Sequence, residues 1–379
     1  MIRRLFKKVK KREPLQKIYW VATQSCNLEC KYCTCIKKDL QFACDIEIEE
    51  FCRILDTIQK IANPQQVMIV FSGGEPLMRT DIVELGKEVV KRGFKWGIET
   101  NGFALTSELI RKLIVTGLNK IWISVNGMES VHNWYKGHAK SFENAMYGIK
   151  QFVNQGSNVD LEITTIVHAK NYDDLNLLHD MFVYLKVKNW RLLAINPNRD
   201  KFNAVLEQLR LSNFQFGQLL NSIKGWQRQK YLNIDLGCNG FLTSKEFGVI
   251  EHPFSCTTGY NSITIKNDGS VYRCPKIPNS PKIGNVFDDN FTQEWSRVFG
   301  TKDDKIKVCN GCSNEKLCMG CALLKMFSLI NIFFLLLSYF VYSYLYHTFG
   351  FYFQQVLCLP LAKAGGINIL VADILLIGY

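Results

Sequence analysis

Short apolar runs alternate with amphipathic segments along the first two thirds of the chain. The runs span residues 17–22, 66–71, 95–100, 120–125, 159–167 and 189–195, and helical patterns lie between them at 48–61, 82–91, 107–116, 142–153 and 175–185. Six strands interleaved with helices predict a parallel sheet, because each return crossing needs a helix-sized connection. The carboxyl ends of such strands gather at one face, where we expect the functional site. Periodicity leaves open whether the sheet closes fully.

A polar loop after the first predicted strand places Cys26, Cys30 and Cys33 at C-x3-C-x2-C spacing. A structural zinc site takes four protein ligands, whereas three thiolates on one loop leave one iron of an iron-sulfur cluster open for another molecule. The spacing therefore favours a cluster with an open iron.

Polar and glycine-rich residues follow three successive strands, at 72–76, 99–102 and 124–127. Glycine lets a backbone approach a ligand closely, and the neighbouring polar groups can bond to it. Each segment alone is typical of an ordinary turn. Together, beside the cysteine loop, they predict a binding site.

More cysteines follow residue 236, around a predicted hairpin at 262–274 with a turn signal at 267–269. Cys238 and Cys256 precede the hairpin and Cys274 ends it, while Cys309, Cys312, Cys318 and Cys321 follow at C-x2-C-x5-C-x2-C spacing. A zinc knuckle is one interpretation of the last four. The additional thiols favour iron-sulfur clusters.

The chain has fourteen cysteines and a net charge of +12, and these indicate its cellular compartment and the charge of its binding partners. The N-terminus lacks the apolar region of a signal peptide, so we expect a reducing cytoplasm, where clustered thiols hold metals. A basic arm at 1–16 suits an acidic partner, nucleic acid or an anionic membrane, or is a solvated tail.

The segment 326–353 contains no Asp, Glu, Lys or Arg and is long enough to span a bilayer, which takes about 20 residues. Another apolar stretch, 364–379, is interrupted by Asp373. We expect either a C-terminal membrane anchor or a C-terminus read out of frame.

The chain resembles radical S-adenosylmethionine (SAM) enzymes that carry a C-terminal SPASM domain, such as anaerobic sulfatase-maturating enzymes. The resemblance covers about residues 17–321 and depends on the cysteine loop, the Gly-Gly-Glu-Pro run at 73–76, and the segments 256–275 and 283–295. Asn126 replaces a usual aspartate and Lys136 a common arginine. The resemblance implies a partial (β/α)6 barrel at 17–236, a small SPASM-like domain at 237–325 and an apolar tail at 326–379.

In this family, SAM binds the open iron of a 4Fe-4S cluster, and one electron cleaves it to a 5′-deoxyadenosyl radical that takes a hydrogen atom from the substrate. The resemblance implies that Cys26, Cys30 and Cys33 hold this cluster. It implies SAM contacts at Tyr32, Gly73, Gly74, Glu75, Asn101 and Ser124, and identifies no catalytic side chain. Five histidines, His132, His138, His168, His179 and His252, lack metal-ligand spacing and favour structural roles.

The resemblance also implies auxiliary 4Fe-4S clusters. Cys256, Cys274 and Cys321, with Cys238 as a possible fourth ligand, would hold the first, and Cys309, Cys312 and Cys318 the second. The spacing from Cys318 to Cys321 is shorter than usual, and only Cys358 follows. A reading-frame change near Gly320 would explain both departures and leave the second cluster short of a ligand.

The leading function is hydrogen abstraction from a peptide or protein side chain, with a small molecule as another substrate class. A ferredoxin or flavodoxin is the expected electron donor, and no nucleic acid is expected as a partner. The alternative is a membrane-attached iron-sulfur or zinc protein without enzymatic activity, for electron transfer or cluster assembly. That alternative gives the residues at 73–76 no role.

Overall fold

The computed structural model describes residues 14–33, 45–195, 208–237, 261–272 and 282–298, and the structural statements below concern these residues. Their strands form one sheet in the order β10-β9-β8-β1-β2-β3-β4-β5-β6-β7. The strands are β1 (Lys17–Thr23), β2 (Met68–Gly73), β3 (Lys95–Thr100), β4 (Lys120–Ser124), β5 (Asp160–Val167), β6 (Asn189–Ala194), β7 (Asn233–Gly237), β8 (Ser262–Ile265), β9 (Ser270–Tyr272) and β10 (Lys282–Asn285). All pairs from β8 to β7 are parallel, which confirms the predicted α/β fold with a parallel sheet.

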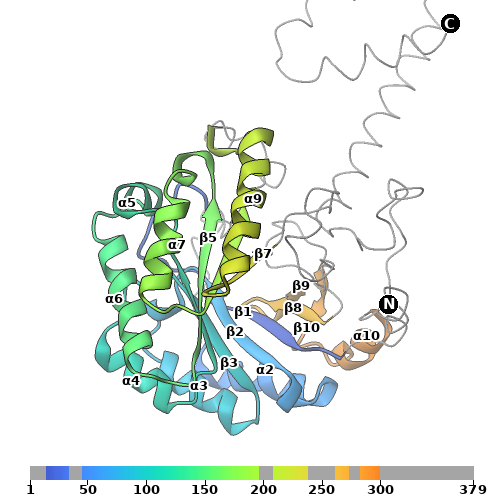
Figure 1. Ribbon diagram of the computed structural model, residues 1–379. Helices are drawn as coiled ribbons and strands as arrows, with labels where there is room; N and C mark the ends of the chain where they lie inside the picture. The colour runs from blue at the N-terminus through green and yellow to red at the C-terminus, as the bar shows by residue number, and fades with distance from the viewer. Residues whose placement is uncertain (1–13, 34–44, 196–207, 238–260, 273–281, 299–379) are drawn as a thin grey trace, which may run out of the picture. The chain divides into compact units, whose positions relative to one another are not determined.

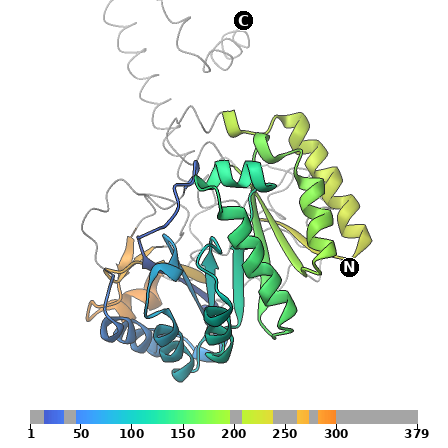
Figure 2. The same ribbon diagram turned by 90° about the vertical axis from the view of Figure 1, so that its left-hand side faces the viewer.

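Helices connect the parallel strands and cover one face of the sheet, which we call the outer face (Figures 1 and 2). They are α2 (Ile48–Ile61), α3 (Ile82–Lys91), α4 (Ser107–Val115), α5 (Glu129–Lys136), α6 (Ser141–Asn154), α7 (Leu175–Tyr184), α9 (Asn213–Gln229) and α10 (Phe291–Val298), with short 3-10 helices η2 (Pro64–Gln66), η3 (Pro76–Met78) and η4 (Ala169–Asn171). The predicted strands and helices agree with these bounds to within about two residues. The sequence pattern did not predict α5, α9, α10, β7 or β10.

Alternation along the strands separates an apolar outer face from a polar inner face. In β1, Trp20 faces outward and stacks on Phe51 of α2 with ring centroids 4.0 Å apart, and Phe71 of β2 meets Trp20 edge-on at 5.1 Å. Side chains one position along the same strands point to the opposite, inner face, because successive residues of a strand alternate. Burial of the outer face holds the helices on the sheet.

The hairpin of β8 and β9 extends the sheet beside β1. Lys17 pairs with Ser262 in parallel register, and β9 returns antiparallel to β8. Gly269 closes the turn with φ +74°, a conformation that favours glycine. The hairpin predicted at 262–274 is thus confirmed over its described residues.

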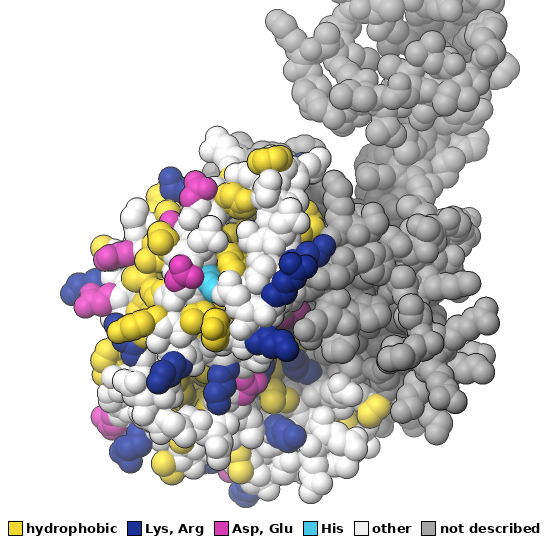
Figure 3. All heavy atoms as spheres, in the orientation of Figure 1, with side chains coloured by type: hydrophobic (Ala, Val, Ile, Leu, Met, Phe, Trp, Pro, Cys, Tyr) yellow, Lys and Arg dark blue, Asp and Glu magenta, His cyan; other side chains and the backbone are white. Residues whose placement is uncertain are grey.

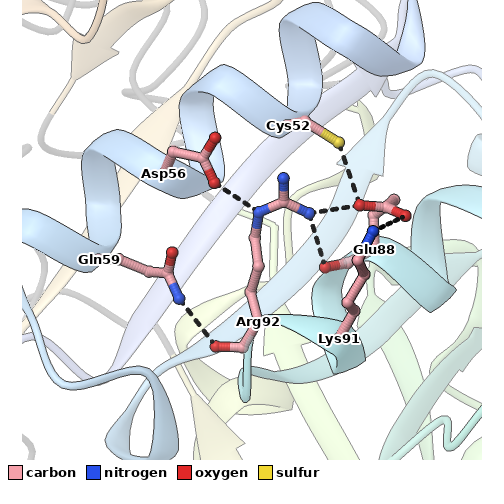
Figure 4. A network of polar contacts seen from close by, with 6 residues as sticks. All are labelled: Cys52, Asp56, Gln59, Glu88, Lys91 and Arg92. Carbon is pink, nitrogen blue, oxygen red and sulfur yellow. Dashed lines mark hydrogen bonds and ion pairs between the residues drawn. The ribbon is translucent and has the colours of Figure 1, made fainter.

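A polar network joins α2 to α3 (Figure 4). Arg92, just after α3, donates from Nε to Asp56 at 2.6 Å and from Nη1 to the carboxylate of Glu88. Cys52 lies 3.4 Å from Glu88 Oε2, and burial, with this hydrogen bond, raises the pKa of its thiol. Cys52 therefore belongs to the contact between two helices, far in sequence from the cysteine loop.

The space-filling view shows acidic, basic and apolar side chains interspersed on the face that carries α7 and α9 (Figure 3). Exposed apolar side chains on this side of the fold include Leu177, Tyr184 and Phe214. The positive charge of the chain is therefore not gathered into one block over this described face.

The chain divides into two compact units, Met1–Leu323 and Leu324–Tyr379, and the second lies entirely outside the described residues. The predicted tail at 326–379, most of the basic arm and all the proposed auxiliary-cluster cysteines also lie outside them. Among the helices that the structure does describe, none is long and apolar enough to cross a membrane.

Candidate functional site

Glu75 connects the end of β2 to the end of β3. Its Oε1 accepts hydrogen bonds from Thr100 Oγ1 at 2.6 Å and from the Leu77 amide at 3.1 Å, and its Oε2 accepts from the Asn101 amide at 2.7 Å. The side chain is 1% exposed. Burial raises the pKa of this carboxyl, while the donors and the nearby Lys136 ammonium act in the opposite direction.

The two glycines before Glu75 pack directly against the chain that leads into the cysteine loop. The Gly74 amide donates to Thr23 O at 2.8 Å, and the Glu75 amide donates to Ser25 O at 2.8 Å. A Cβ on Gly74 would lie 2.1 Å from Ser25 O, and one on Gly73, where φ is +122°, would lie 2.2 Å from Thr23 O. Only glycine permits this contact.

This contact also limits what the turn can offer a ligand. The amides of Gly74 and Glu75 are already bonded, so these residues offer a ligand carbonyl oxygens rather than amide hydrogens, and of the carbonyls in the turn those of Glu75 and Pro76 already accept from the Met78 and Arg79 amides. Carbonyl oxygens accept hydrogen bonds and favour a donor of positive charge. An ammonium group fits these requirements, and a phosphate or carboxylate does not.

The three cysteines of the loop share one region. Cys26 and Cys30 are partly buried and Cys33 is exposed. Burial raises the pKa of the Cys30 thiol, the sulfurs of Cys33 and Cys26 raise it further, and the Lys136 ammonium lowers it. Bound iron would offset this cost, because a metal ion deprotonates a coordinating thiol.

Among the residues that the structure describes, no three His, Cys, Asp or Glu side chains converge closely enough to hold one metal ion. A 4Fe-4S cluster makes a different demand, because each cysteine binds its own iron and the sulfurs surround the cluster. Three thiols on one loop, beside a turn that accepts an ammonium, fit a cluster with one open iron.

The end of α5 holds the cysteine loop in place. Glu29 and Lys31 donate backbone hydrogen bonds to the carbonyls of Lys136 and Tyr135 at 3.2 and 2.8 Å. The Tyr135 hydroxyl donates to the Tyr32 carbonyl at 3.0 Å. The loop is therefore built on a helix that the sequence reading did not anticipate.

Asn101 ties the same loop to β3. Its Nδ2 donates to Asn27 Oδ1 at 2.8 Å, and its Oδ1 accepts from the Phe103 amide at 2.8 Å. Both the nitrogen and the oxygen of the Asn101 side chain therefore already have a hydrogen-bond partner within the protein. The predicted SAM contacts of Asn101, Tyr32 and Ser124 remain predictions, and Ser124 lies at the end of β4 with its side chain on the inner face.

His132 supports the turn after β4. Its Nδ1 accepts from the Asn126 amide at 3.0 Å, and its Nε2 lies 3.0 Å from Ser141 Oγ. Burial, with the positive charge of Lys136, lowers the pKa of His132 to about 3. The ring is therefore neutral at physiological pH, and its two nitrogens hold the turn after β4 against the start of α6.

Asn126, which replaces the aspartate usual in related sequences, uses its side chain within this turn. Its Oδ1 accepts from the Ile166 amide at 2.8 Å. An amide oxygen serves this bond as well as a carboxylate oxygen would, and it adds no charge to the turn. The substitution is therefore compatible with the local structure.

Lys136 is the cation of the site. It is 5% exposed, and its charge acts on both Glu75 and Cys30. Because a buried charge is stable only where opposite charges lie near it, the Lys136 ammonium is suited to an anionic group of a ligand as well. The sequence marked Lys136 only as a replacement for arginine, and because α5 was not predicted, no sequence signal placed Lys136 in the site.

The family model of the radical SAM superfamily matches residues 20–181. A tungsten-containing aldehyde ferredoxin oxidoreductase cofactor-modifying protein of Pyrococcus furiosus is 32% identical over 332 residues, which cover 79% of this chain and 88% of the relative. The AdoMet-dependent heme synthase of Nitratidesulfovibrio vulgaris is 24% identical over 80% of this chain and 86% of its own length. The Fe-coproporphyrin III synthase of Methanosarcina barkeri is 29% identical over 45% of this chain and 41% of its own.

Solved structures share the fold. Native anSMEcpe with bound AdoMet has a TM-score of 0.63 at 17% identity, over 82% of this chain and 90% of that chain. Streptococcus suis SuiB bound to the precursor peptide SuiA has a TM-score of 0.62 at 17% identity, over 84% of this chain and 74% of that chain. With the cysteine loop, the docked Gly-Gly-Glu turn and a relative of 32% identity over most of its length, the chain belongs to the radical SAM superfamily.

Proposed function

We propose that this radical SAM enzyme abstracts a hydrogen atom from a carboxylate-bearing cofactor precursor of the tetrapyrrole class. The observation that carries the SAM-dependent part is the docking of the Gly74 and Glu75 amides on Thr23 and Ser25. This contact joins the cysteine loop and the carbonyl oxygens of the turn into one site.

Each part of the site has a role in this proposal. Cys26, Cys30 and Cys33 hold a 4Fe-4S cluster, and the carbonyl oxygens of the turn accept hydrogen bonds from the SAM ammonium. Lys136 neutralises the SAM carboxylate, in place of the arginine common in related sequences. When bound, the cluster and SAM supply the electron and the carbon radical that remove hydrogen from a substrate.

The curated relatives support the choice of substrate class. The heme synthases match along most of this chain, and the Methanosarcina relative is named for a porphyrin. A peptide substrate, favoured by the resemblance to sulfatase-maturating enzymes, draws on similarity to structures such as peptide-bound SuiB, and at 17% identity that similarity concerns the fold alone. The relatives therefore favour a small cofactor precursor over a peptide.

The auxiliary clusters remain part of the proposal. Cys256, Cys274 and Cys321 would hold one cluster, and Cys309, Cys312 and Cys318 a second that is short of a ligand. Iron and sulfide analysis of the reconstituted full chain tests this. About twelve irons per chain corresponds to both auxiliary clusters beside the SAM-binding cluster, about eight to one auxiliary cluster and about four to none.

The test of function is anaerobic reconstitution with iron and sulfide, followed by dithionite and SAM. We expect 5′-deoxyadenosine by liquid chromatography and mass spectrometry, and more of it when iron-coproporphyrin III is added. A chain with a full cluster content that releases no 5′-deoxyadenosine would refute the enzyme assignment. Release that an added porphyrin leaves unchanged, together with an unaltered porphyrin mass, would refute the substrate class.

A further inference from the structure

The inner face of the sheet carries a group of charged and aromatic side chains near the amino ends of the strands. We call this group the inner cluster; it consists of Lys17 and Tyr19 from β1, Lys120 and Trp122 from β4, Glu162 from β5 and Arg191 from β6. Each alternates with an outward-facing core residue, for example Ile18 with Lys17 and Ile121 with Lys120. The inner cluster therefore faces the interior of the partial barrel, below the strand ends that carry the SAM site.

Trp122 lies at the centre of the inner cluster. Its ring passes over Gly97 of β3, where an added Cβ would lie 2.8 Å from Trp122 Cζ3. The ammonium groups of Lys17 and Lys120 lie 5.4 and 5.1 Å from the ring centroid. The side chain is 4% exposed, and among the described residues its Nε1 hydrogen has no acceptor.

Two of the three cations are neutralised by carboxylates. Lys120 Nζ lies 2.8 Å from Asp160 and 2.7 Å from Glu162. Arg191 Nε lies 2.9 Å from the other oxygen of Glu162 and 3.3 Å from Asp235. Glu162 is buried and forms ion pairs with both cations, so their charges are balanced, although within the described residues Glu162 Oε1 and Arg191 Nε form no hydrogen bond of good geometry.

Lys17 is different. Within the part of the chain that the structure describes, no carboxylate lies within 4 Å of its ammonium. Burial lowers the pKa of Lys17, the Arg191 charge lowers it further, and Glu99 and Glu162 oppose this from longer range. A partly buried ammonium and a buried indole N–H thus lie side by side, and neither has an acceptor among the residues that the structure describes.

We propose that Lys17 and the indole N–H of Trp122 bind a carboxylate of the substrate inside the barrel. A carboxylate has two oxygens, so one can accept from the ammonium and the other from the indole. The pair would hold one end of the substrate below the SAM site and fix which hydrogen faces it. This inference rests on the proposed function, because it names a substrate contact of the same barrel.

The nature of the anion follows from its surroundings. Arg191 and Lys120 already carry carboxylate partners, so the local excess of positive charge at Lys17 suits a single negative charge. The aromatic rings of Tyr19 and Trp122 form apolar walls beside the ammonium, at 5.9 and 5.4 Å from Nζ to the ring centroids. A carboxylate attached to an apolar skeleton matches this combination.

The test compares iron-coproporphyrin III with its fully methylated ester, which keeps the ring and loses the carboxylate charges. Binding to the anaerobically reconstituted full chain is followed by porphyrin absorbance. We expect Lys17→Met to weaken binding of the acid by about tenfold or more and to leave binding of the ester unchanged. Trp122→Phe, which keeps an aromatic ring and removes the N–H, should weaken acid binding in the same selective way.

A matched control is Lys95→Met, because Lys95 is an exposed lysine at the start of the neighbouring strand β3. It should bind both porphyrins as the wild type does. Equal losses for acid and ester in Lys17→Met and Trp122→Phe, unaltered acid binding in both, or a wild type that binds neither porphyrin would each overturn the carboxylate site.

The cleavage of SAM separates this inference from the proposed function. The wild type and the control Lys95→Met should both release 5′-deoxyadenosine from SAM and dithionite without added porphyrin. If the wild type releases none, the proposed function fails whatever the binding results. If it releases 5′-deoxyadenosine and the variants bind the acid normally, only the carboxylate site fails.

Discussion

Thr100 Oγ1 donates a 2.6 Å hydrogen bond to Glu75 Oε1, and this contact joins two strand ends through a carboxylate that is almost fully buried. The side chain of Glu75 therefore has a structural role, because it fixes the end of β3 beside the Gly-Gly-Glu turn. The Glu75 amide donates to Ser25 O and its carbonyl accepts from the Met78 amide, while its carboxylate accepts hydrogen bonds at the end of β3.

Glu75→Gln should lower both stability and SAM binding, although glutamine has almost the same volume as glutamate. The amide replaces one of two accepting oxygens with a donor, which would face the Asn101 amide or the Thr100 hydroxyl. We expect a loss of about 2 kcal/mol in the free energy of unfolding, in the range for buried hydrogen bonds to a charged group, and weaker SAM binding. Urea denaturation and SAM titration measure both. The control is Glu84→Gln, because Glu84 is exposed and forms only a surface ion pair with Lys87. Equal effects of the two variants would contradict a structural role of the Glu75 carboxylate.

Gly74→Ala should prevent the cysteine loop from taking its place. The new Cβ would lie 2.1 Å from Ser25 O and 2.7 Å from Gln24 O, and both are backbone atoms that cannot move aside cheaply. We expect little or no 5′-deoxyadenosine from this variant. Gly217→Ala in α9 is the control, because nothing lies within 4 Å of a Cβ there, and it should stabilise the helix by up to about 1 kcal/mol. Normal SAM cleavage by Gly74→Ala would exclude the close contact.

Cys30→Ser should remove one cluster and leave the others. The reconstituted variant should contain about four fewer irons per chain than the wild type and should not cleave SAM. Cys52→Ser should keep both iron and activity, because Cys52 is bonded to Glu88 between α2 and α3. Iron analysis and visible absorbance check the pair, and a normal iron content in Cys30→Ser would remove it from the ligand set.

His132 should make the fold sensitive to acid. Its pKa of about 3 in the folded chain lies below the ordinary value of 6.5, so the unfolded state binds the proton more tightly. Its contribution to stability is complete above pH 6.5 and is lost as the pH falls toward 3. The loss reaches about 2 kcal/mol at pH 5.

His168 should contribute to the same loss of stability at acid pH, because burial lowers its pKa to about 4. Denaturation between pH 4.5 and 7 measures the combined slope. His132→Gln, whose amide oxygen can still accept from the Asn126 amide, should flatten that slope, while His138→Gln at an exposed position should leave it as it is. An unchanged slope in His132→Gln would mean that His132 is protonated in the fold.

Arg92→Met should loosen the contact between α2 and α3. It removes bonds to Asp56 and Glu88 that are partly shielded from water, and we expect a loss of about 1–2 kcal/mol in the free energy of unfolding. Lys91→Met is the neighbouring control, because that side chain is 71% exposed and its ion pair with Glu88 should contribute under about 0.5 kcal/mol. Similar thermal midpoints for the two variants would argue against the network of Figure 4.

The sequence predicted the sheet well because its outer face is a regular apolar pattern. It predicted α9 poorly because Gly217 and Gly225 interrupt that helix, whose start depends on the Ser212 and Gln215 capping pair. The inner cluster could not be predicted from the sequence, because its residues lie within runs that look apolar. Runs such as 17–22 and 120–125 look apolar overall, and only the pairing of strands reveals that Lys17 and Trp122 share the inner face.

The site was predictable as a location but not as a set of contacts. The spacing of Cys26, Cys30 and Cys33 and the run at 73–76 predicted a SAM site at these strand ends, and the structure brings the two segments into contact. The partner of the Glu75 carboxylate could not be read from the chain, because Thr100 reaches it only through the register of β2 and β3. Lys136 likewise enters the site through the position of α5.

The pairing of β1 with β8 has a consequence for how the chain is made. Gln16 and Asn261, at the start of these strands, contact each other across 245 residues of sequence. During synthesis, β1 and the cysteine loop therefore leave the ribosome long before β8 exists, and that edge of β1 stays unpaired meanwhile. An open strand edge invites aggregation, and contacts of such long range form slowly. A chaperone that covers this edge of β1 during synthesis would therefore protect the strand that leads into the cysteine loop.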